Sequence, residues 1–333
     1  MSKDSVAFWK TWKGKFGSTA DHFTVDNSTD TETILANFAR YFESVNNPVV
    51  NARERELSSE YRSQRARSNE DIFVPALVDA DLVARMIEKL KRGKAVGPDD
   101  ISSEHLKFSH PILACILAKL FGWMLQISHV PNVFCQSITV PIPKGSDIVN
   151  RIVECKDFRG IAISSILAKV FESCLLEVFG DFLVTSENQF GFKKHTGCRD
   201  AIFTARSAIQ RYVDGDETVF IAALDVSKAF PRTNLDALFL VLLKRQVPLI
   251  FVDILDSWLR RSTSRVKWRN LYSDEFQLRT GVNQGSVLAP LLFAIFIDDC
   301  IKRCNKSKLG IILVLMIFFC WPDRGRVCKN CLP

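Results

Sequence analysis

The sequence predicts an α+β fold in which an antiparallel sheet is backed by helices. Three segments, 79–94, 110–128 and 164–179, repeat apolar residues at the spacing of an amphipathic helix. Residues 137–144 have the pattern of a strand, and residues 265–271 with 276–282 look like a strand pair. The presence of both periodicities in one chain predicts the fold class.

Start and stop signals set the bounds of the predicted helices. Gly93 and the following Gly97-Pro98 end the first of them. The segment 157–160 is expected to be a loop that leads into the helix at 164–179. The remaining predicted helices are 234–244, with Asn234 as its N-cap, 248–261 and 287–302.

The N-terminal region, residues 1–78, is predicted to be an arm or linker. Residues 21–70 are polar and mix both charges, so we expect a partly helical, flexible segment with weak order. Residues 1–15 lack the apolar stretch of a secretory signal, so nothing there directs export.

Composition predicts a globular, intracellular protein. Hydrophobic residues make up 47% of the 333 positions, which allows a sizeable core. The formal charge of +7 favours polyanions, but 37 acidic residues dilute it too far to identify nucleic acid as the ligand. The 10 cysteines are mostly single, as in a reducing compartment, either nucleus or cytoplasm. The longest apolar run, 309–321, is shorter than the roughly 20 residues of a membrane span, so none is expected.

Asp225 is the most informative acidic residue, because it closes the apolar run 220–224. Such a run predicts a buried strand that delivers a carboxylate at its end. A buried charge has to be paired, protonated or bound to a cation, and a divalent metal ion is the natural partner. The alternative is a strand-end aspartate that only caps the next turn.

A series of short motifs follows in a fixed order along the chain. It comprises Gly97-Pro98-Asp99, Pro141-Ile142-Pro143-Lys144, Phe158-Arg159, Gln189-Phe190-Gly191-Phe192, Asp225 with Phe230, and Gln284-Gly285. The series resembles the reverse transcriptases of non-LTR (LINE-like) retrotransposons over about residues 80–310. Each motif is unspecific alone, but the complete set in this order is specific.

The resemblance implies a right-hand polymerase with a fingers-like region at 79–210 and an incomplete palm at 211–310. It also implies RNA-directed DNA polymerase activity with an RNA template, a DNA primer and deoxynucleoside triphosphates. In this family two Mg²⁺ ions are held on palm aspartates, and hard Mg²⁺ prefers such oxygen ligands. Asp225 would be the catalytic and metal-binding carboxylate, with the backbone carbonyl of Val226 beside it.

The resemblance also assigns five residues to the incoming nucleotide. Phe230 would form an aromatic wall under the sugar; the alternative is core packing. Gln284 and Gly285 would lie on the nucleotide; the alternative is an ordinary turn. Lys144 and Arg159 would grip the triphosphate; the alternative is a pair of solvated surface cations.

A basic stretch follows the Gln189–Phe192 motif. By the same resemblance, Lys193, Lys194 and His195 would face the template or primer backbone, in a contact that does not depend on base sequence. The alternative is a solvated basic turn.

The second palm motif of the family, an aromatic residue followed by Ala-Asp-Asp in a hairpin, does not occur in this sequence. Phe296-Ile297-Asp298-Asp299 resembles it but falls in the predicted helix 287–302, too close to the Gln284 turn to be that hairpin. We expect its two aspartates to face solvent or to cap polar groups rather than to bind metal. Pro231 also replaces the aspartate that usually follows the aromatic residue.

The tail, residues 311–333, is predicted to be an aberrant, frameshifted translation. One choice of codons for Val314–Trp321 spells Ala-Asp-Asp in a shifted frame, which sequencing of the gene would test. The pair Cys328 and Cys331 then loses its meaning as half a zinc site.

The sequence therefore predicts a reverse transcriptase fragment with little or no polymerase activity, because one palm carboxylate cannot close a two-metal site. Two rival hypotheses stay open. One is a non-catalytic remnant that binds nucleic acid, and the other is an unfolded pseudogene product. The oligomeric state does not follow from the sequence.

Overall fold

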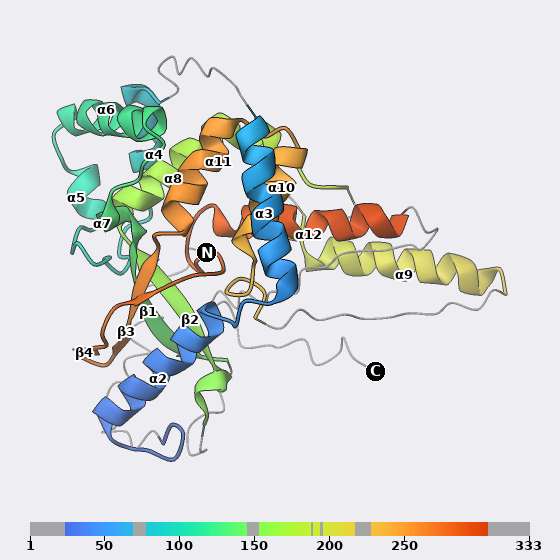
Figure 1. The fold of residues 1–333 in the computed structure, drawn as a ribbon, viewed down its shortest axis with the longest axis horizontal. Helices are drawn as coiled ribbons and strands as arrows, with labels where there is room; N and C mark the ends of the chain where they lie inside the picture. The colour runs from blue at the N-terminus through green and yellow to red at the C-terminus, as the bar shows by residue number, and fades with distance from the viewer. Residues whose placement is uncertain are drawn as a thin grey trace, which may run out of the picture.

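A mixed β-sheet lies beside a cluster of helices, and α2 runs along its strands (Figure 1). The computed structural model describes residues 24–68, 78–144, 153–187, 189–193, 196–216 and 228–305, with side chains up to residue 298. This arrangement confirms the predicted α+β class. The division into fingers and palm stays a prediction.

The sheet has the strand order β2-β1-β3-β4, and β5 pairs with β3. β1 (Gln136–Pro143) runs antiparallel to β2 (Phe158–Ser164) and parallel to β3 (Thr263–Trp268). The short strands β4 (Leu271–Tyr272) and β5 (Phe276–Gln277) are antiparallel to β3. The prediction of an antiparallel sheet was therefore wrong. Several helices separate β1 from β3 in the chain, and such a long crossover is what parallel strands require.

The bounds of two predicted strand features also change. Residues 158–160 lie in β2 and not in a loop, because β2 pairs with β1 along its whole length. The pairing of β3 with β5 confirms the predicted strand pair, but β3 begins at Thr263 and β5 ends at Gln277.

The helices predicted from residue 79 onward are present. In chain order the helices are α2 (Thr31–Asn46), α3 (Ala52–Arg67), α4 (Ala80–Glu88), α5 (Ser103–Lys107), α6 (Ile112–Gln126), α7 (Asn132–Cys135), η1 (Cys155–Asp157), α8 (Ile166–Phe179), η2 (Gly180–Phe182), α9 (Cys198–Asp214), α10 (Leu235–Lys244), α11 (Leu249–Leu259) and α12 (Ala289–Asn305). Asn234 caps α10 as predicted, since its side chain accepts a hydrogen bond from the Ala237 amide at 2.9 Å. Within the described ranges, no helix has both the length and the apolar character that crossing a membrane requires.

The larger hydrophobic core joins α4, α6, α8, α10, α11 and α12. The rings of Phe121 and Phe171 lie 4.9 Å apart between centroids, and Phe171 stacks on Trp258 at 5.6 Å. Trp258 Nε1 donates a hydrogen bond to the Phe134 carbonyl at 3.0 Å, so the polar atom of this buried ring is satisfied. Dense packing of this kind holds α6, α8 and α11 in a fixed relation.

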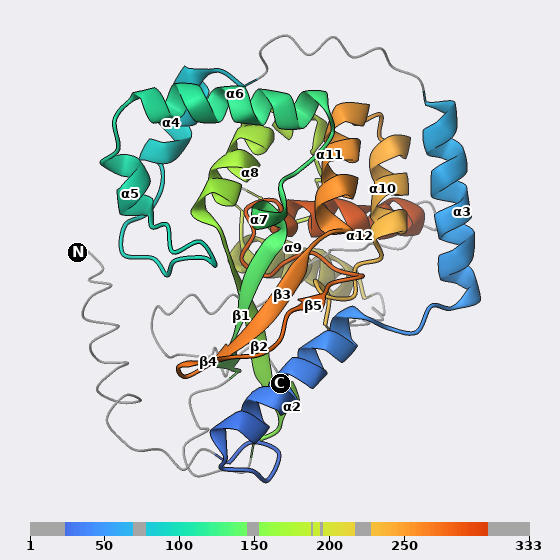
Figure 2. The same cartoon turned by 60° about the vertical axis from the view of Figure 1, so that its left-hand side comes forward.

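α2 forms a second, smaller core with the sheet (Figure 2). Asp30 caps the helix by accepting a hydrogen bond from the Thr33 amide at 2.8 Å, and Ile34 and Phe38 are buried. The Phe38 ring centroid lies 4.9 Å from that of Phe158 in β2 and 5.0 Å from that of Trp268 in β3. The expectation of weak order was therefore wrong for α2, whose apolar face repeats at helical spacing.

α3 packs beside α10 through a small contact. Tyr61 is its buried residue, with its ring 5.3 Å from Phe239, and Arg65 forms a two-point ion pair with Asp253 at 2.6 Å. A helix of 16 residues with one buried side chain has no apolar stripe. For this reason its polar composition predicted weak order. That prediction was wrong, because the structure has an ordered helix docked on α10.

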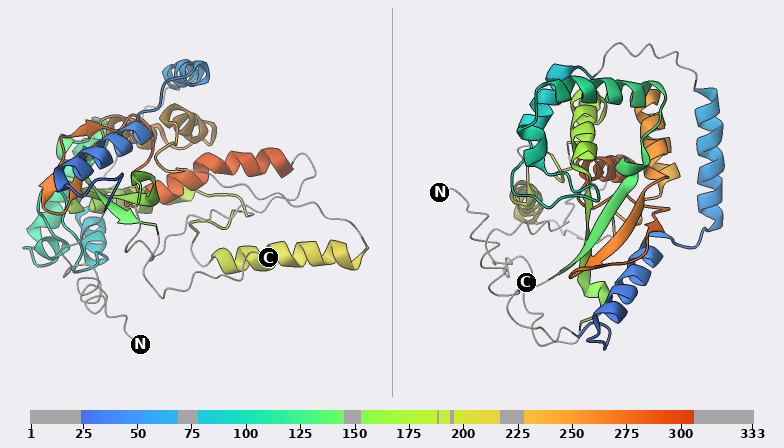
Figure 3. Two further views of the ribbon diagram at one scale, coloured as in Figure 1. Left: turned by 90° about the horizontal axis from the view of Figure 1, so that it is seen from below. Right: turned by 90° about the vertical axis from the view of Figure 1, so that its left-hand side faces the viewer.

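α9, like α3, buries a single side chain. It extends away from the sheet (Figure 3), and Ala201 is its one buried residue. Phe203 on this helix is 71% exposed. Phe203 therefore provides an exposed phenylalanine with which the buried Phe38 can be compared.

Replacing Phe38 with alanine should lower the free energy of unfolding by about 3–5 kcal/mol, because it empties a packed site between α2 and the sheet. Urea denaturation followed by circular dichroism measures this. Phe203→Ala is the matched control and should change stability by no more than about 0.5 kcal/mol. Equal midpoints for the two variants would contradict the docking of α2 on the sheet.

Candidate functional site

The loop after the Asp225 segment is hydrogen-bonded to the segment before Gln284. The Val282 amide donates to the Phe230 carbonyl at 3.0 Å, and the Gly281 amide donates to the Thr233 carbonyl at 2.8 Å. Gly281 has φ +92°, and a Cβ there would lie 2.6 Å from the backbone of Pro231. Two motifs that are about 50 residues apart in the chain therefore meet through their backbones.

The turn at Gln284-Gly285 lies against β2. The Ala162 amide donates a hydrogen bond to the Gln284 carbonyl at 2.7 Å. Gly285 has φ +124°, and a Cβ at this position would lie 2.2 Å from the Ala162 carbonyl oxygen. Only glycine fits such a conformation and such a close approach. The sequence analysis assigned this glycine to the nucleotide, which stays a prediction; the group that its backbone approaches in the structure is Ala162 of β2.

The Gly97-Pro98-Asp99 loop contacts the junction between β2 and α8. Ser165 Oγ donates a hydrogen bond to Asp99 Oδ2 at 2.5 Å and also accepts one from the Leu167 amide, which caps α8. A Cβ on Gly97 would lie 2.8 Å from the backbone of Ser164 and Ser165. Strand β2 and the start of α8 are thus the meeting point of this motif and the Gln284-Gly285 turn.

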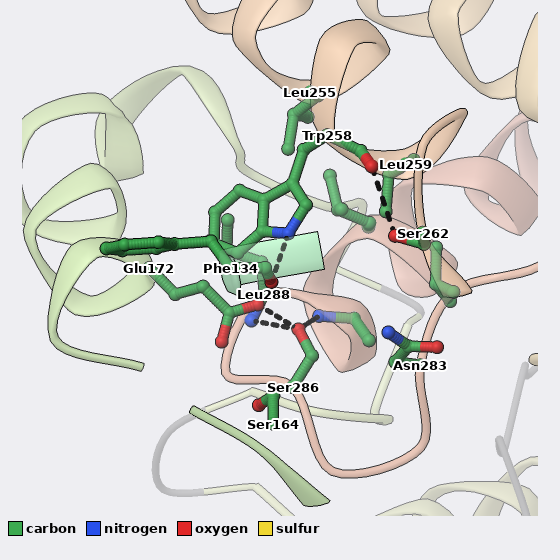
Figure 4. Close-up of a pocket in the computed structure, with 13 residues that line it drawn as sticks. Phe134, Ser164, Glu172, Leu255, Trp258, Leu259, Ser262, Asn283, Ser286 and Leu288 are labelled. Atoms are coloured by element: carbon green, nitrogen blue, oxygen red, sulfur yellow. Dashed lines mark hydrogen bonds between the residues drawn. The ribbon is translucent and has the colours of Figure 1, made fainter. Parts of the chain in front are cut away.

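Glu172 on α8 is a buried carboxylate that the sequence analysis did not select. It accepts a hydrogen bond from the Ser286 hydroxyl (Figure 4). It accepts another from the Val287 amide at 2.9 Å. Burial raises the pKa of Glu172 and outweighs the hydrogen bonds from Ser286 and Val287, which lower it. A glutamate between the apolar residues Phe171 and Cys174 of a predicted helix was the signal available in the sequence.

A cavity beside Glu172 is too small to be the substrate site. Its volume is about 20 Å³, and its lining includes Ser164, Trp258, Asn283 and Ser286. One water molecule needs about 10–15 Å³ on this measure, whereas ligand pockets measure about 300–1,000 Å³. The cavity therefore has no room for a nucleotide.

Lys144 and Arg159 lie at the same end of the β1–β2 pair. Arg159 is opposite Ile142 in the register, and the Lys144 amide donates to the Asp157 carbonyl at 2.9 Å. Lys144 is exposed and Arg159 is half-buried. The structure thus brings together the two cations that were assigned to the triphosphate.

Lys228, in the loop after the Asp225 segment, adds positive charge near Lys144. Burial, followed by the neighbouring cations Arg232 and Lys144, lowers the pKa of Lys228. Its Nζ atom also lies 4.7 Å from the ring centroid of Tyr41 on α2. Cations so close together favour a polyanionic ligand, because it relieves their mutual repulsion.

Phe230 lies inside the main core, with 1% of its surface exposed. Its ring stacks on Phe293 at 5.1 Å between centroids and meets Phe192 edge-on at 5.9 Å. This environment matches core packing, which the sequence analysis gave as the alternative for Phe230. A role as the wall under the sugar stays a prediction.

The remaining predicted site residues fall partly outside the described residues. Lys193 is half-buried, and its Nζ donates to the Ser186 carbonyl at 2.5 Å. Lys194 and His195 lie outside the described residues, as do Asp225 and Val226. Among the residues that are described, no group of three or more His, Cys, Asp or Glu side chains is arranged to hold a metal ion.

Residues 142–320 match the family described as reverse transcriptase (RNA-dependent DNA polymerase). This range is more than half of the chain and contains β2, the loop after the Asp225 segment and the Gln284-Gly285 turn. This chain belongs to the reverse transcriptase family.

Curated relatives show that it is a reverse transcriptase domain of the LINE-like kind. It is 26% identical over 222 residues to the probable RNA-directed DNA polymerase from transposon BS of Drosophila melanogaster, covering 65% of this chain and 24% of the relative. It is 25% identical over 235 residues to the Pol polyprotein of the type-2 retrotransposable element R2DM of the same species, covering 71% and 21%. Identity to the RNA-directed DNA polymerase from mobile element jockey, also of that species, is 24% over 230 residues, covering 67% and 24%. The reverse transcriptase domain thus spans less than a quarter of the length of each of these relatives.

Asp298, from the segment that resembles the second palm motif, has a buried structural environment. Its side chain is 0% exposed; it accepts hydrogen bonds from the Ser186 amide at 2.8 Å and from Arg245 Nη2 at 2.6 Å. Burial opposes its ionisation, but the hydrogen bond from Ser186 and the guanidinium of Arg245 outweigh it and lower the pKa. Of the two alternatives expected for this residue, exposure to solvent was wrong, whereas capping of polar groups describes its bonds to Ser186 and Arg245. Its predicted position in a helix, α12, was correct.

Asp298→Asn should lower the free energy of unfolding by about 3–5 kcal/mol, since it removes the charge that compensates the buried Arg245 guanidinium. Chemical denaturation at neutral pH measures this, and Asp181→Asn at an exposed position should stay within about 0.5 kcal/mol of wild type.

The effect should depend on pH in a defined direction. Because the folded pKa of Asp298 is lowered, the stabilisation is complete above the unfolded value of about 3.9 and is lost as pH falls through the folded value. The stability difference between wild type and Asp298→Asn should therefore shrink below about pH 4. Mg²⁺ that stabilised the wild type but not the variant would instead favour a metal-binding role.

Proposed function

We propose that this domain binds an RNA template, a DNA primer and a deoxynucleoside triphosphate at the junction of β2, the loop after Asp225 and the Gln284-Gly285 turn. The observation that carries the proposal is the backbone hydrogen bond between Ala162 of β2 and Gln284, because β2 also carries Arg159. One strand thus sets the spacing between a phosphate-binding cation and the turn.

Each predicted residue has a role in this proposal. Arg159, as a planar fork, and Lys144, as a point charge, bind the triphosphate. Gln284 and Gly285 lie on the incoming nucleotide. Phe230 supports the sugar side of the site from the core. Lys193, Lys194 and His195 contact the template or primer backbone.

Asp225 and the carbonyl of Val226 would hold Mg²⁺ in this proposal. A carboxylate and a carbonyl are the oxygen donors that a hard cation prefers, so the donor set fits the metal. When bound, a pair of such cations stabilises the attacking and leaving oxygens of nucleotidyl transfer. The chain's own cations bind and orient the triphosphate for that step.

We further propose that this polypeptide has little or no polymerase activity. Its sequence contains one of the palm carboxylates and no Ala-Asp-Asp, so the two-metal arrangement stays incomplete. A second candidate function is nucleic-acid binding without synthesis, favoured by the cations Lys144, Lys228 and Arg232 near one another. We also propose that the protein is located inside the cell.

Arg159→Ala and Lys144→Ala should each weaken binding of dTTP with Mg²⁺ about tenfold, because each removes a charge-assisted contact. Equilibrium dialysis in the presence of a poly(rA)/oligo(dT) hybrid measures this. Arg53→Ala is the control, since Arg53 is an exposed cation on α3 paired with Glu56. An equal loss of dTTP affinity in all three variants would show that the affinity depends on net charge alone and not on these two positions.

Primer extension on the same hybrid with Mg²⁺ should give no incorporation above that of Asp225→Ala. Robust incorporation that Asp225→Ala abolishes would contradict the proposed inactivity. Salt-sensitive hybrid binding that is indifferent to Mg²⁺ would favour the second candidate function.

A further inference from the structure

The Gln284-Gly285 turn is held from two sides. On one side its backbone bonds to β2, through the Ala162 amide and the Gln284 carbonyl. On the other side, the residues directly after the turn bond to the side chain of Glu172 on α8. Since β2 and α8 are joined by Ser165 alone, both supports belong to one continuous stretch of chain.

Both oxygens of Glu172 act as acceptors. Oε1 accepts from the Ser286 hydroxyl, and Oε2 accepts from the Val287 amide at 2.9 Å. Ser286 Oγ in turn accepts from the Leu288 amide at 3.2 Å and from the Ala289 amide at 3.1 Å. The carboxylate therefore accepts directly from the two residues that follow the turn. Through Ser286 it is also linked to the amides at the start of α12.

A carboxylate suits this position better than its amide isostere. A glutamine would have to place its NH₂ group against either the Val287 N–H or the Ser286 hydroxyl, which already accepts two amides. The amino end of α12, a helix of 17 residues, also favours a negative charge. Because Glu172 is buried, bulk water does not reach it, and the adjacent cavity of about 20 Å³ holds at most about one water molecule in place of a lost partner.

We propose that Glu172 is a positioning residue that fixes the Gln284-Gly285 turn against β2, and so sets the distance between Gln284 and Arg159 where both meet the nucleotide. The second half of this statement rests on the proposed function. The first half concerns the turn alone and can be tested without a ligand.

Hydrogen exchange of the full 333-residue chain, read peptide by peptide, tests the first half. Glu172→Gln should speed exchange in residues 283–289 at least about tenfold, while residues 136–143 of β1 stay within about twofold of wild type. Glu177→Gln is the matched control, since Glu177 lies on the same helix but is 52% exposed and pairs with Lys89 at 3.8 Å. It should leave both segments unchanged.

Ser286→Ala provides a milder variant in case Glu172→Gln does not fold. It removes the hydroxyl that links the carboxylate to α12, and it should speed exchange in the same segment and in the same order of magnitude. Exchange in 283–289 that matches wild type in the folded variants would overturn the proposal. Equal acceleration across the whole chain would overturn it too, because it would show a general loss of stability rather than release of the turn.

Nucleotide binding tests the second half. Glu172→Gln should weaken dTTP binding to the hybrid complex about tenfold, and leave the salt dependence of hybrid binding unchanged. An unchanged dTTP affinity with a released turn would overturn the link from Glu172 to the nucleotide. If the wild type binds no dTTP, the proposed function fails, and the exchange result still decides whether Glu172 holds the turn.

Discussion

The close contact between β2 and the Gln284-Gly285 turn is the constraint on which the rest of the site depends. A hydrogen bond of 2.7 Å joins the Ala162 amide to the Gln284 carbonyl, and it forms only because residue 285 has no Cβ. The carbonyl of Ala162 blocks that space. β2 already pairs with β1 on its other edge, so the turn inherits the rigidity of the sheet. The loop that follows Asp225 bonds to the same segment through Val282, and is held in place by it.

The N-terminal helix α2 is part of this arrangement rather than an appendage. Asn47, just after the helix, donates to the Gln277 carbonyl at 3.0 Å and accepts from the Arg279 amide at 3.0 Å. Thr280 Oγ1 is hydrogen-bonded to the carbonyls of Asn46 and Pro231 at 2.9 and 3.0 Å. The end of α2 thus connects β5, the approach to the turn and the loop after Asp225. Asn46 and Asn47 therefore hold these segments in place from the end of α2.

Local patterns predicted α4, α6, α8, α10, α11 and α12 well because each carries its own signals, as Asn234 does for α10, but they gave no helix at α9. The order of motifs assigned Arg159 and Gln284 to one site, which stays a prediction, and it could not identify Ala162 of β2 as the partner of Gln284. Contacts between residues distant in sequence could not be predicted from local patterns. The parallel pairing of β1 with β3 depends on the crossover between them. The contact of Phe38 with Trp268 depends on how the sheet is assembled. The buried acid Glu172 was missed because a helical pattern treats a single glutamate as an exposed position.

Two buried acids contact α12 or the residues just before it, and they differ in how their charge is compensated: Glu172 bonds to Ser286 and Val287, whereas Asp298 lies within the helix. Glu172 has no guanidinium among its hydrogen-bond donors, so burial dominates and its pKa is raised. Asp298 has Arg245, and its pKa is lowered. Asp298 also accepts from the Ser186 amide, while the Ser186 carbonyl accepts from the Gln189 amide at 3.0 Å and from Lys193 Nζ. Asp298 supports the Gln189–Phe192 motif through Ser186, while the residues just before the same helix bond to Glu172 beside the Gln284 turn. The helix therefore couples the segment assigned to the template with the segment assigned to the nucleotide, and a metal ion on Asp298 would have to break that coupling.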